Sequence, residues 1–134
     1  MPTPQIAFEA RLATTPDHAI ERVTAALKAE GFGVLTRIDT HDVFKQKLGI
    51  EFRPYTILGA CNPTLAHRAL NQSATVGLLL PCNVTVEASG EGSMVRIANP
   101  EAMLLAGGME NDPALVELMH EVRGRLERVA AALS

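Results

Sequence analysis

The stretch YTILGACNPTLAHRAL, residues 55–70, predicts a strand that runs directly into a helix. Its first six residues are mostly apolar, which is typical of a strand buried on both faces of a sheet. Asn62 and Pro63 then indicate a helix start, because the Asn side chain accepts a bond from a free helix N–H and Pro lacks the N–H that has no partner there. Three further pairs of this kind predict three more helix starts: Thr15-Pro16, Asn99-Pro100 and Asp112-Pro113.

The pattern of apolar residues around these helix starts indicates about five strands. We expect strands over residues 5–12, 32–38, 55–60, 76–88 and 93–98, with Pro81 as a candidate break in the fourth strand and a hairpin turn at residues 89–92. We expect helices over residues 16–30, 41–48, 63–71, 100–106 and 113–133. Helices interspersed with strands predict an α+β fold, in which residues 1–134 form a two-layer single domain with one mixed sheet of about five strands and helices packed on it.

The composition argues against nucleic-acid and membrane partners. The chain has 12 basic and 15 acidic residues, a net charge of −3, and only 4% aromatic residues, whereas nucleic-acid-binding domains usually carry a basic stripe or an aromatic stacking surface. The longest apolar run is far shorter than the ~20 residues that span a membrane. The first twelve residues lack the basic and apolar segments of a signal peptide. We therefore expect a soluble cytoplasmic protein whose cysteines are reduced.

The chain's only two cysteines are each followed by asparagine, as Cys61-Asn62 and Cys82-Asn83. The residues between them are expected to form a helix of ~14 Å and then a strand segment of roughly 20 Å. If the two strands run parallel, both cysteines lie near the carboxyl ends of their strands, where open α/β sheets bind ligands. We expect this parallel arrangement because strand–helix–strand connections favour it, although this crossover is short. Antiparallel strands should instead separate the two thiols.

The position of Cys61 beside a helix start has two interpretations. The helix dipole there stabilises a thiolate and can lower the pKa of a thiol, and the free N–H groups can hold an anion. Alternatively, Cys61 is a small buried hydrophobe, as free cysteines often are. Asn62 is explained by its capping role, but Asn83 is not, since Asn is depleted in strands. Asn83 therefore either bonds locally beside Pro81 or directs its amide into a pocket.

The sequence does not predict a metal site. His67 is the obvious third ligand beside the two thiols, but at 100° per residue it points about 130° away from the apolar side of its helix. The cysteines form no C-x-x-C pair, and the chain has no phosphate-binding loop, nucleophile elbow or H-E-x-x-H motif. The sequence names no cofactor and leaves open whether the protein is an enzyme.

Two segments around the cysteines carry a family resemblance. KLGIEFRPYTILGACNPTLAHRAL, residues 47–70, and GLLLPCNVTV, residues 77–86, resemble the domain of unknown function family DUF302. NPEAML, residues 99–104, and the amphipathic last helix extend the likeness over nearly the whole chain. The resemblance implies a two-layer α+β fold and a homodimer, but no established activity. It also marks seven positions here: Gly59, Cys61, Asn62, Pro63, Pro81, Cys82 and Asn83.

Three functions are compatible with these residues. The first is a homodimeric module that binds a small ligand, anionic or thiol-reactive, at a site formed by Gly59, Cys61, Asn62, Pro63, Cys82 and Asn83. The second is a thiol-dependent enzyme with Cys61 as its nucleophile, the one candidate catalytic residue. The third is a structural or interaction domain in which both cysteines are simply buried.

Overall fold

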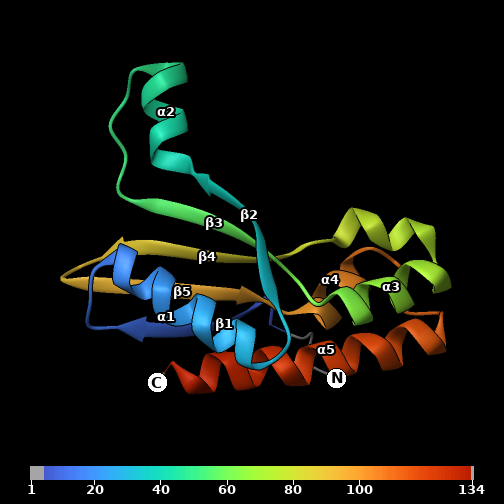
Figure 1. Cartoon of the computed structure of the whole chain (residues 1–134). Helices are drawn as coiled ribbons and strands as arrows, with labels where there is room; N and C mark the ends of the chain where they lie inside the picture. Colours follow the sequence, from blue (N-terminus) through green and yellow to red (C-terminus); the bar gives the residue numbers. More distant parts are fainter. Residues whose placement is uncertain (1–4, 134) are drawn as a thin grey trace.

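An open antiparallel sheet organises the fold in the computed structural model, which describes residues 5–133 (Figure 1). Its strands are β1 (Ala7–Leu12), β2 (Gly33–Asp39), β3 (Tyr55–Cys61), β4 (Cys82–Ser89) and β5 (Gly92–Ala98). They lie in the order β1-β5-β4-β3-β2, and every neighbouring pair in the described part of the chain is antiparallel. The predicted α+β class and five-stranded sheet are confirmed. Residues 1–4 and 134 of the expected domain lie outside the described range.

The predicted parallel pairing of strands 55–60 and 76–82 is wrong. β3 and β4 are antiparallel neighbours, with Leu58 opposite Val84. Because all four neighbouring strand pairs of the described residues are antiparallel, the sheet is antiparallel rather than mixed. The reason is that α3 (Pro63–Gln72), which follows β3, packs on other helices beyond the end of the sheet and does not run back along it.

All four helix starts predicted from a cap residue and a proline are confirmed. α1 (Pro16–Ala29), α3 (Pro63–Gln72), α4 (Pro100–Ala106) and α5 (Pro113–Ala132) each begin at the proline. In every case the preceding side chain accepts a backbone N–H of the first turn, at 3.0–3.2 Å: Thr15 from His18, Asn62 from Leu65, Asn99 from Glu101 and Asp112 from Leu115. These local bonds explain why the helix starts could be read from the sequence.

The strand expected over residues 76–88 begins only at Cys82. Residues Ala74–Leu79 instead form a short 3₁₀ helix, η1, so the prediction is wrong for residues 76–81. A short apolar run does not distinguish a strand from a buried helical turn, and Pro81 cannot donate a ladder hydrogen bond. Val76 is fully buried and anchors η1 in the core.

The sheet has one buried face and one open face, as is common for antiparallel sheets. α1 and α5 pack on the buried face, where the alternating side chains are at most 1% exposed: Leu58, Val84, Val86, Val95 and Ile97. The side chains between them on the same strands belong to the other surface. We call this surface the open face and define it by five half-buried residues: Tyr55, Ile57, Thr85, Met94 and Arg96.

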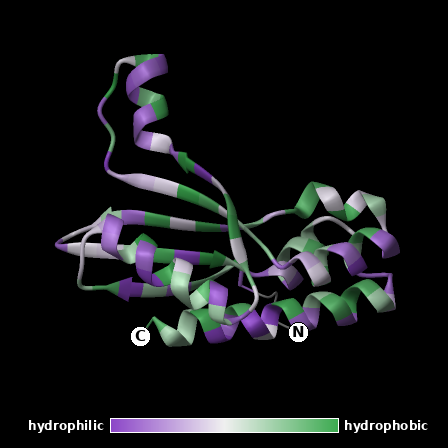
Figure 2. Ribbon diagram, in the orientation of Figure 1, coloured by the Kyte–Doolittle hydropathy of each residue, from purple (hydrophilic) through white to green (hydrophobic). Residues whose placement is uncertain are grey.

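A projecting segment forms the second notable feature of the fold. We call residues 35–54 the arm; it comprises most of β2, the helix α2 (Thr40–Leu48) and the loop that leads into β3. The arm extends away from the other helices (Figure 1). None of the described α2 residues is buried, and hydrophobic and hydrophilic residues alternate along it (Figure 2). The arm ends at β3, and β3 in turn ends at Cys61.

Candidate functional site

The two cysteines lie at the same end of the sheet. Cys61 is the last residue of β3, Cys82 is the first of β4, and Ala60 is the register partner of Cys82. The expectation that antiparallel strands would separate the thiols is therefore wrong. α3 does not return along the sheet but packs on η1 and α5 beyond the strand ends (Figure 1). The chain consequently re-enters the sheet at the end where it left.

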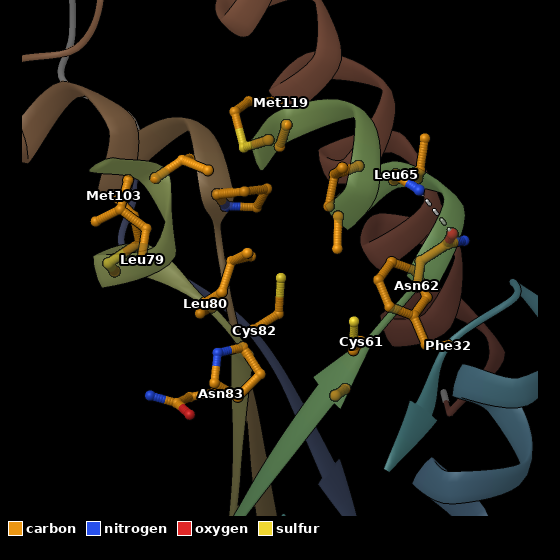
Figure 3. A pocket seen from close by; sticks show the side chains of 18 of the residues that line it. Phe32, Cys61, Asn62, Leu65, Leu79, Leu80, Cys82, Asn83, Met103 and Met119 are labelled. Carbon is orange, nitrogen blue, oxygen red and sulfur yellow. Dashed lines mark hydrogen bonds between the residues drawn. The ribbon is translucent and has the colours of Figure 1, made fainter. Parts of the chain in front are cut away.

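Both thiols line a cavity of about 320 Å³. Figure 3 shows the sulfur atoms of Cys61 and Cys82 directed toward the same space, with Leu65, Leu80 and Met119 around it. Most of the lining is apolar and comes from four helical elements, which lie between residues 63 and 132. These residues are Leu65, Ala66 and Ala69 of α3, Val76 and Leu79 of η1, Met103 of α4, and Met119 and Val122 of α5.

Four of the six predicted site residues line this cavity: Cys61, Asn62, Cys82 and Asn83. Gly59 and Pro63 are not part of the lining. Gly59 has a packing role instead, because a Cβ at this position would overlap with Thr36 Oγ1 and lie 2.7 Å from Pro81 Cγ. Pro63 is the first residue of α3 and is exposed. Pro81, which the family resemblance marks, does line the cavity.

The two asparagines occupy different parts of the site. Asn62 Oδ1 accepts the Leu65 backbone N–H at 3.1 Å (Figure 3). A Cβ on Gly31, whose φ is 86°, would lie 2.8 Å from Asn62 Nδ2, so glycine is required there for space and for conformation. Asn83 is exposed at the rim, and Figure 3 shows its amide pointing away from the two sulfur atoms. Asn83 therefore lies at the entrance rather than in the interior.

The comparisons with known proteins agree with this architecture. The family model for the domain of unknown function DUF302 matches residues 8–133. The chain belongs to the DUF302 family. A solved structure, the crystal structure of an uncharacterized conserved DUF302 protein from Bacillus stearothermophilus, is similar with a TM-score of 0.87 and 32% sequence identity. The match covers 98% of this chain and 100% of that one. No curated protein matches the chain.

Burial sets the chemistry of the second thiol in this DUF302 cavity. Removal from water, and to a lesser extent the nearby Cys61 thiol, together raise the pKa of the Cys82 thiol from an ordinary 9.0 to about 11. A desolvated thiol resists ionisation because its charged form loses hydration. Cys82 is therefore a neutral thiol at physiological pH, and both cysteines are free and half-buried.

The charged group that borders the cavity is already neutralised. Arg96 donates to Glu87 and to Glu9, in both cases at 2.7 Å. Glu87 also accepts from Arg53 at 2.9 Å. The hydrogen bond from Arg96 is the main cause of the lowered pKa of Glu87. This network lies on the open face beside the cavity and leaves its apolar interior without a free charge among the described lining residues.

His67 lies on the exposed side of α3, as its helical position predicts, and its ring is 3.3 Å from the Asn71 amide. Within residues 5–133, no cluster of three or more His, Cys, Asp or Glu side chains is arranged to hold a metal ion. Over the same residues, no helix has the length and apolar character needed to cross a membrane.

The sequence reasoning missed most of the apolar lining. The run Leu78-Leu79-Leu80 and the apolar stripe of the last helix were visible as patterns, but each was also explained by ordinary core packing. Nothing in the sequence indicates that Met103 of α4 lies near Met119 of α5 at this cavity. Only the folded arrangement of α4 and α5 shows it.

Proposed function

We propose that this DUF302 chain is a homodimeric small-ligand-binding module whose ligand lies in the cavity beside Cys61 and Cys82. The observation that carries the proposal is a cavity of about 320 Å³ that is mainly apolar and receives two free thiols. Ligand sites are typically concave and apolar with a few placed polar groups, and they begin at ~300 Å³. A small apolar molecule, with or without a thiol-reactive group, fits this description.

An anionic ligand has less support. The described lining contains one charged side chain, Arg96, and two carboxylates already neutralise it. At the start of α3, the Asn62 side chain and carbonyl already accept the N–H groups of Leu65 and Ala66. The neutralised Arg96 and the occupied N–H groups at the start of α3 therefore both favour an uncharged ligand over an anion.

Binding of two fluorescent probes tests the proposal. N-phenyl-1-naphthylamine is uncharged, and 1-anilinonaphthalene-8-sulfonate has a similar frame with a sulfonate. The uncharged probe should bind more tightly. Ala66→Phe, which fills the cavity, should weaken binding by at least about tenfold, an easily measured change in Kd.

Ala25→Phe is the matched control, since Ala25 is an exposed helical alanine on α1. It should bind the probe like the wild type. If both variants bind alike, or if the wild type binds neither probe, the ligand-binding proposal is wrong. Tighter binding of 1-anilinonaphthalene-8-sulfonate than of the uncharged probe would instead favour an anionic ligand.

The enzyme alternative has less support than binding. A cysteine nucleophile needs a neighbouring base or a lowered pKa, and among the described lining residues there is no histidine. The burial that raises the pKa of Cys82 acts against a second thiolate. The alternative in which both cysteines are merely buried is weakened by their partial exposure and by the cavity that they share.

Three further parts of the proposal rest on the sequence. We propose that residues 1–134 form a single domain, that the protein acts in the cytoplasm, and that nucleic acid is not a partner. The net charge of −3 and the scarcity of aromatic residues support the last point.

A further inference from the structure

The arm carries an unusual share of the exposed apolar surface. Of the eleven large hydrophobic side chains that are exposed in residues 5–133, six lie in this 20-residue segment. They are Leu35 (67% exposed), Ile38 (48%), Val43 (40%), Leu48 (64%), Ile50 (47%) and Phe52 (37%). A nine-residue helix is marginal in water without tertiary packing, and α2 buries none of its described residues. This concentration indicates a surface that another molecule covers.

Internal contacts hold the arm in a defined shape. The rings of Phe44 and Phe52 meet edge to face with centroids 5.1 Å apart, and the Arg53 guanidinium lies 4.5 Å from the centre of the Phe52 ring. The His41 ring accepts the Tyr55 backbone N–H at 2.9 Å and joins α2 to β3. The arm therefore presents its apolar side chains in a preorganised arrangement, which reduces the entropy lost on binding.

The open face offers the complementary surface. Its central side chains, Ile57, Thr85 and Met94, are half-buried. Four of its charged side chains are paired within the chain through the Glu9–Arg96–Glu87–Arg53 network, at N–O distances of 2.7–2.9 Å. Arg11, the register partner of Met94, donates instead to the Ser89 carbonyl and hydroxyl at 3.1 and 2.9 Å. A second molecule that covers this face therefore leaves each of these side chains with a partner, whereas a buried charge without a partner is strongly destabilising.

The cavity reaches the same face. Tyr55, Asn83, Thr85 and Arg96 belong to the open side of the sheet or its rim, and all four line the cavity together with the helices. An arm placed over the open face would thus close the exposed side of the ligand site.

We propose that the arm of each copy covers the open face of a second copy and completes its ligand cavity. This inference rests on the homodimer of the proposed function and specifies its interface. Both surfaces occur on every chain, so a two-fold axis lets each arm meet the partner's open face, as isologous dimers require.

Size and charge favour a second copy as the occupant. The 20 arm residues and the open face together match the ~20–30 residues that each partner contributes to a standard interface. The arm contains four basic and three acidic residues, and its close pairs include Arg37–Asp39 at 3.1 Å and Lys45–Glu51 at 3.6 Å. The arm is therefore nearly neutral and meets a face whose charged side chains already have hydrogen-bond partners in their own chain.

Sedimentation equilibrium of the full chain tests the interface. The wild type should be a dimer, and Leu48→Glu should weaken dimerisation by at least about tenfold, because it places a charge among the arm's apolar side chains. Leu105→Glu is the matched control: Leu105 is 40% exposed on α4, away from the arm. This control should dimerise like the wild type.

A mixing experiment distinguishes arm-on-face pairing from arm-on-arm pairing. Met94→Lys places a charge on the open face, next to Glu87 in the register, and should likewise weaken the homodimer by at least about tenfold. Mixing the Leu48→Glu and Met94→Lys chains pairs one intact arm with one intact face. A heterodimer should therefore form, weaker than the wild-type dimer. Thr85→Lys replaces Met94→Lys if circular dichroism shows that the latter is unfolded.

The possible outcomes separate the two proposals. A wild type that stays monomeric at about 100 µM, well above the Kd of a specific dimer, or a Leu48→Glu variant that dimerises normally, overturns this inference. Mixed variants that form no heterodimer overturn arm-on-face pairing. Binding of a different protein to a wild type that stays monomeric also overturns the proposed interface between two copies. If the variants change dimerisation as expected but the wild-type dimer binds neither fluorescent probe, only the ligand-binding proposal is contradicted.

Discussion

Replacing Gly59 by alanine should destabilise the protein through a single misplaced methyl group. Gly59 lies in the middle of β3, opposite Asn83 of β4 and Thr36 of β2. The added Cβ would overlap with Thr36 Oγ1 and approach Pro81 Cγ to 2.7 Å. Overpacking of this kind costs about 1–3 kcal/mol. With a urea m-value of ~2 kcal/mol/M, a loss of about 2 kcal/mol lowers the unfolding midpoint by ~1 M.

The neighbouring strand provides a matched control. Gly33 lies in β2, and a Cβ there meets no described heavy atom within 4 Å. Gly33→Ala should therefore leave the free energy of unfolding unchanged or raise it by about 0.4–1 kcal/mol, because alanine restricts the unfolded chain. The contrast between the two glycines isolates the packing term from the general effect of adding a methyl group to a strand.

A double-mutant cycle identifies the group responsible. Thr36 is exposed, so Thr36→Ala alone should change stability by less than about 0.5 kcal/mol. The double variant Thr36→Ala with Gly59→Ala should recover at least ~0.5 kcal/mol of the loss, since one of the two overlaps is removed. Urea unfolding followed by circular dichroism measures all four chains. A Gly59→Ala protein as stable as the wild type would refute the packing role assigned to Gly59.

Two further predictions concern ionisable groups. The hydrogen bond from Arg96 lowers the pKa of Glu87 below its ordinary 4.5, so this carboxylate stabilises the fold above that pH and the stabilisation is lost as the pH falls through the lowered pKa. Glu87→Gln should consequently reduce Tm at pH 7, and the difference from the wild type should shrink below pH 4.5; a constant difference over pH 3–7 would contradict the ion-pair argument. For the thiols, Cys82 in a Cys61→Ser variant should react with iodoacetamide with a half-maximal pH still above the ordinary 9.0, because burial is the larger cause of the pKa shift. A half-point at or below 9.0 would show that the Cys82 thiol is solvated.

The parts of the fold that depend on neighbours in the sequence could be predicted. A cap residue and its proline act within one helical turn, which is why the starts of α1, α3, α4 and α5 were found. The β4–β5 hairpin was equally local, with Gly90 at φ 59° in its turn.

The direction in which β4 pairs with β3 was not local and was predicted wrongly. It depends on whether α3 packs back on the sheet or on η1 and α5 beyond its end. Both arrangements satisfy the apolar pattern of α3, so the pattern could not decide between them. The proximity of Cys61 and Cys82 was therefore expected for the wrong reason.

The residues of the candidate site could likewise be predicted only in part. Cys61, Asn62, Cys82 and Asn83 stood out because the chain's only two cysteines are each followed by asparagine, and all four line the cavity. Gly59 also stood out, but its role is to leave room for Thr36 and Pro81. The apolar walls have no unusual residue types. They become a site only when α3, η1, α4 and α5 meet.

The location of the cavity beyond the strand ends has a consequence for how the family can diversify. Side chains such as Leu79 and Met103 shape the cavity from outside the strand ladders. Substitution of these side chains changes the shape of the cavity without changing the pairing partner of any strand. If the proposed ligand binding holds, selection can act on ligand choice while leaving the sheet intact, so that relatives with superimposable backbones need not share a ligand.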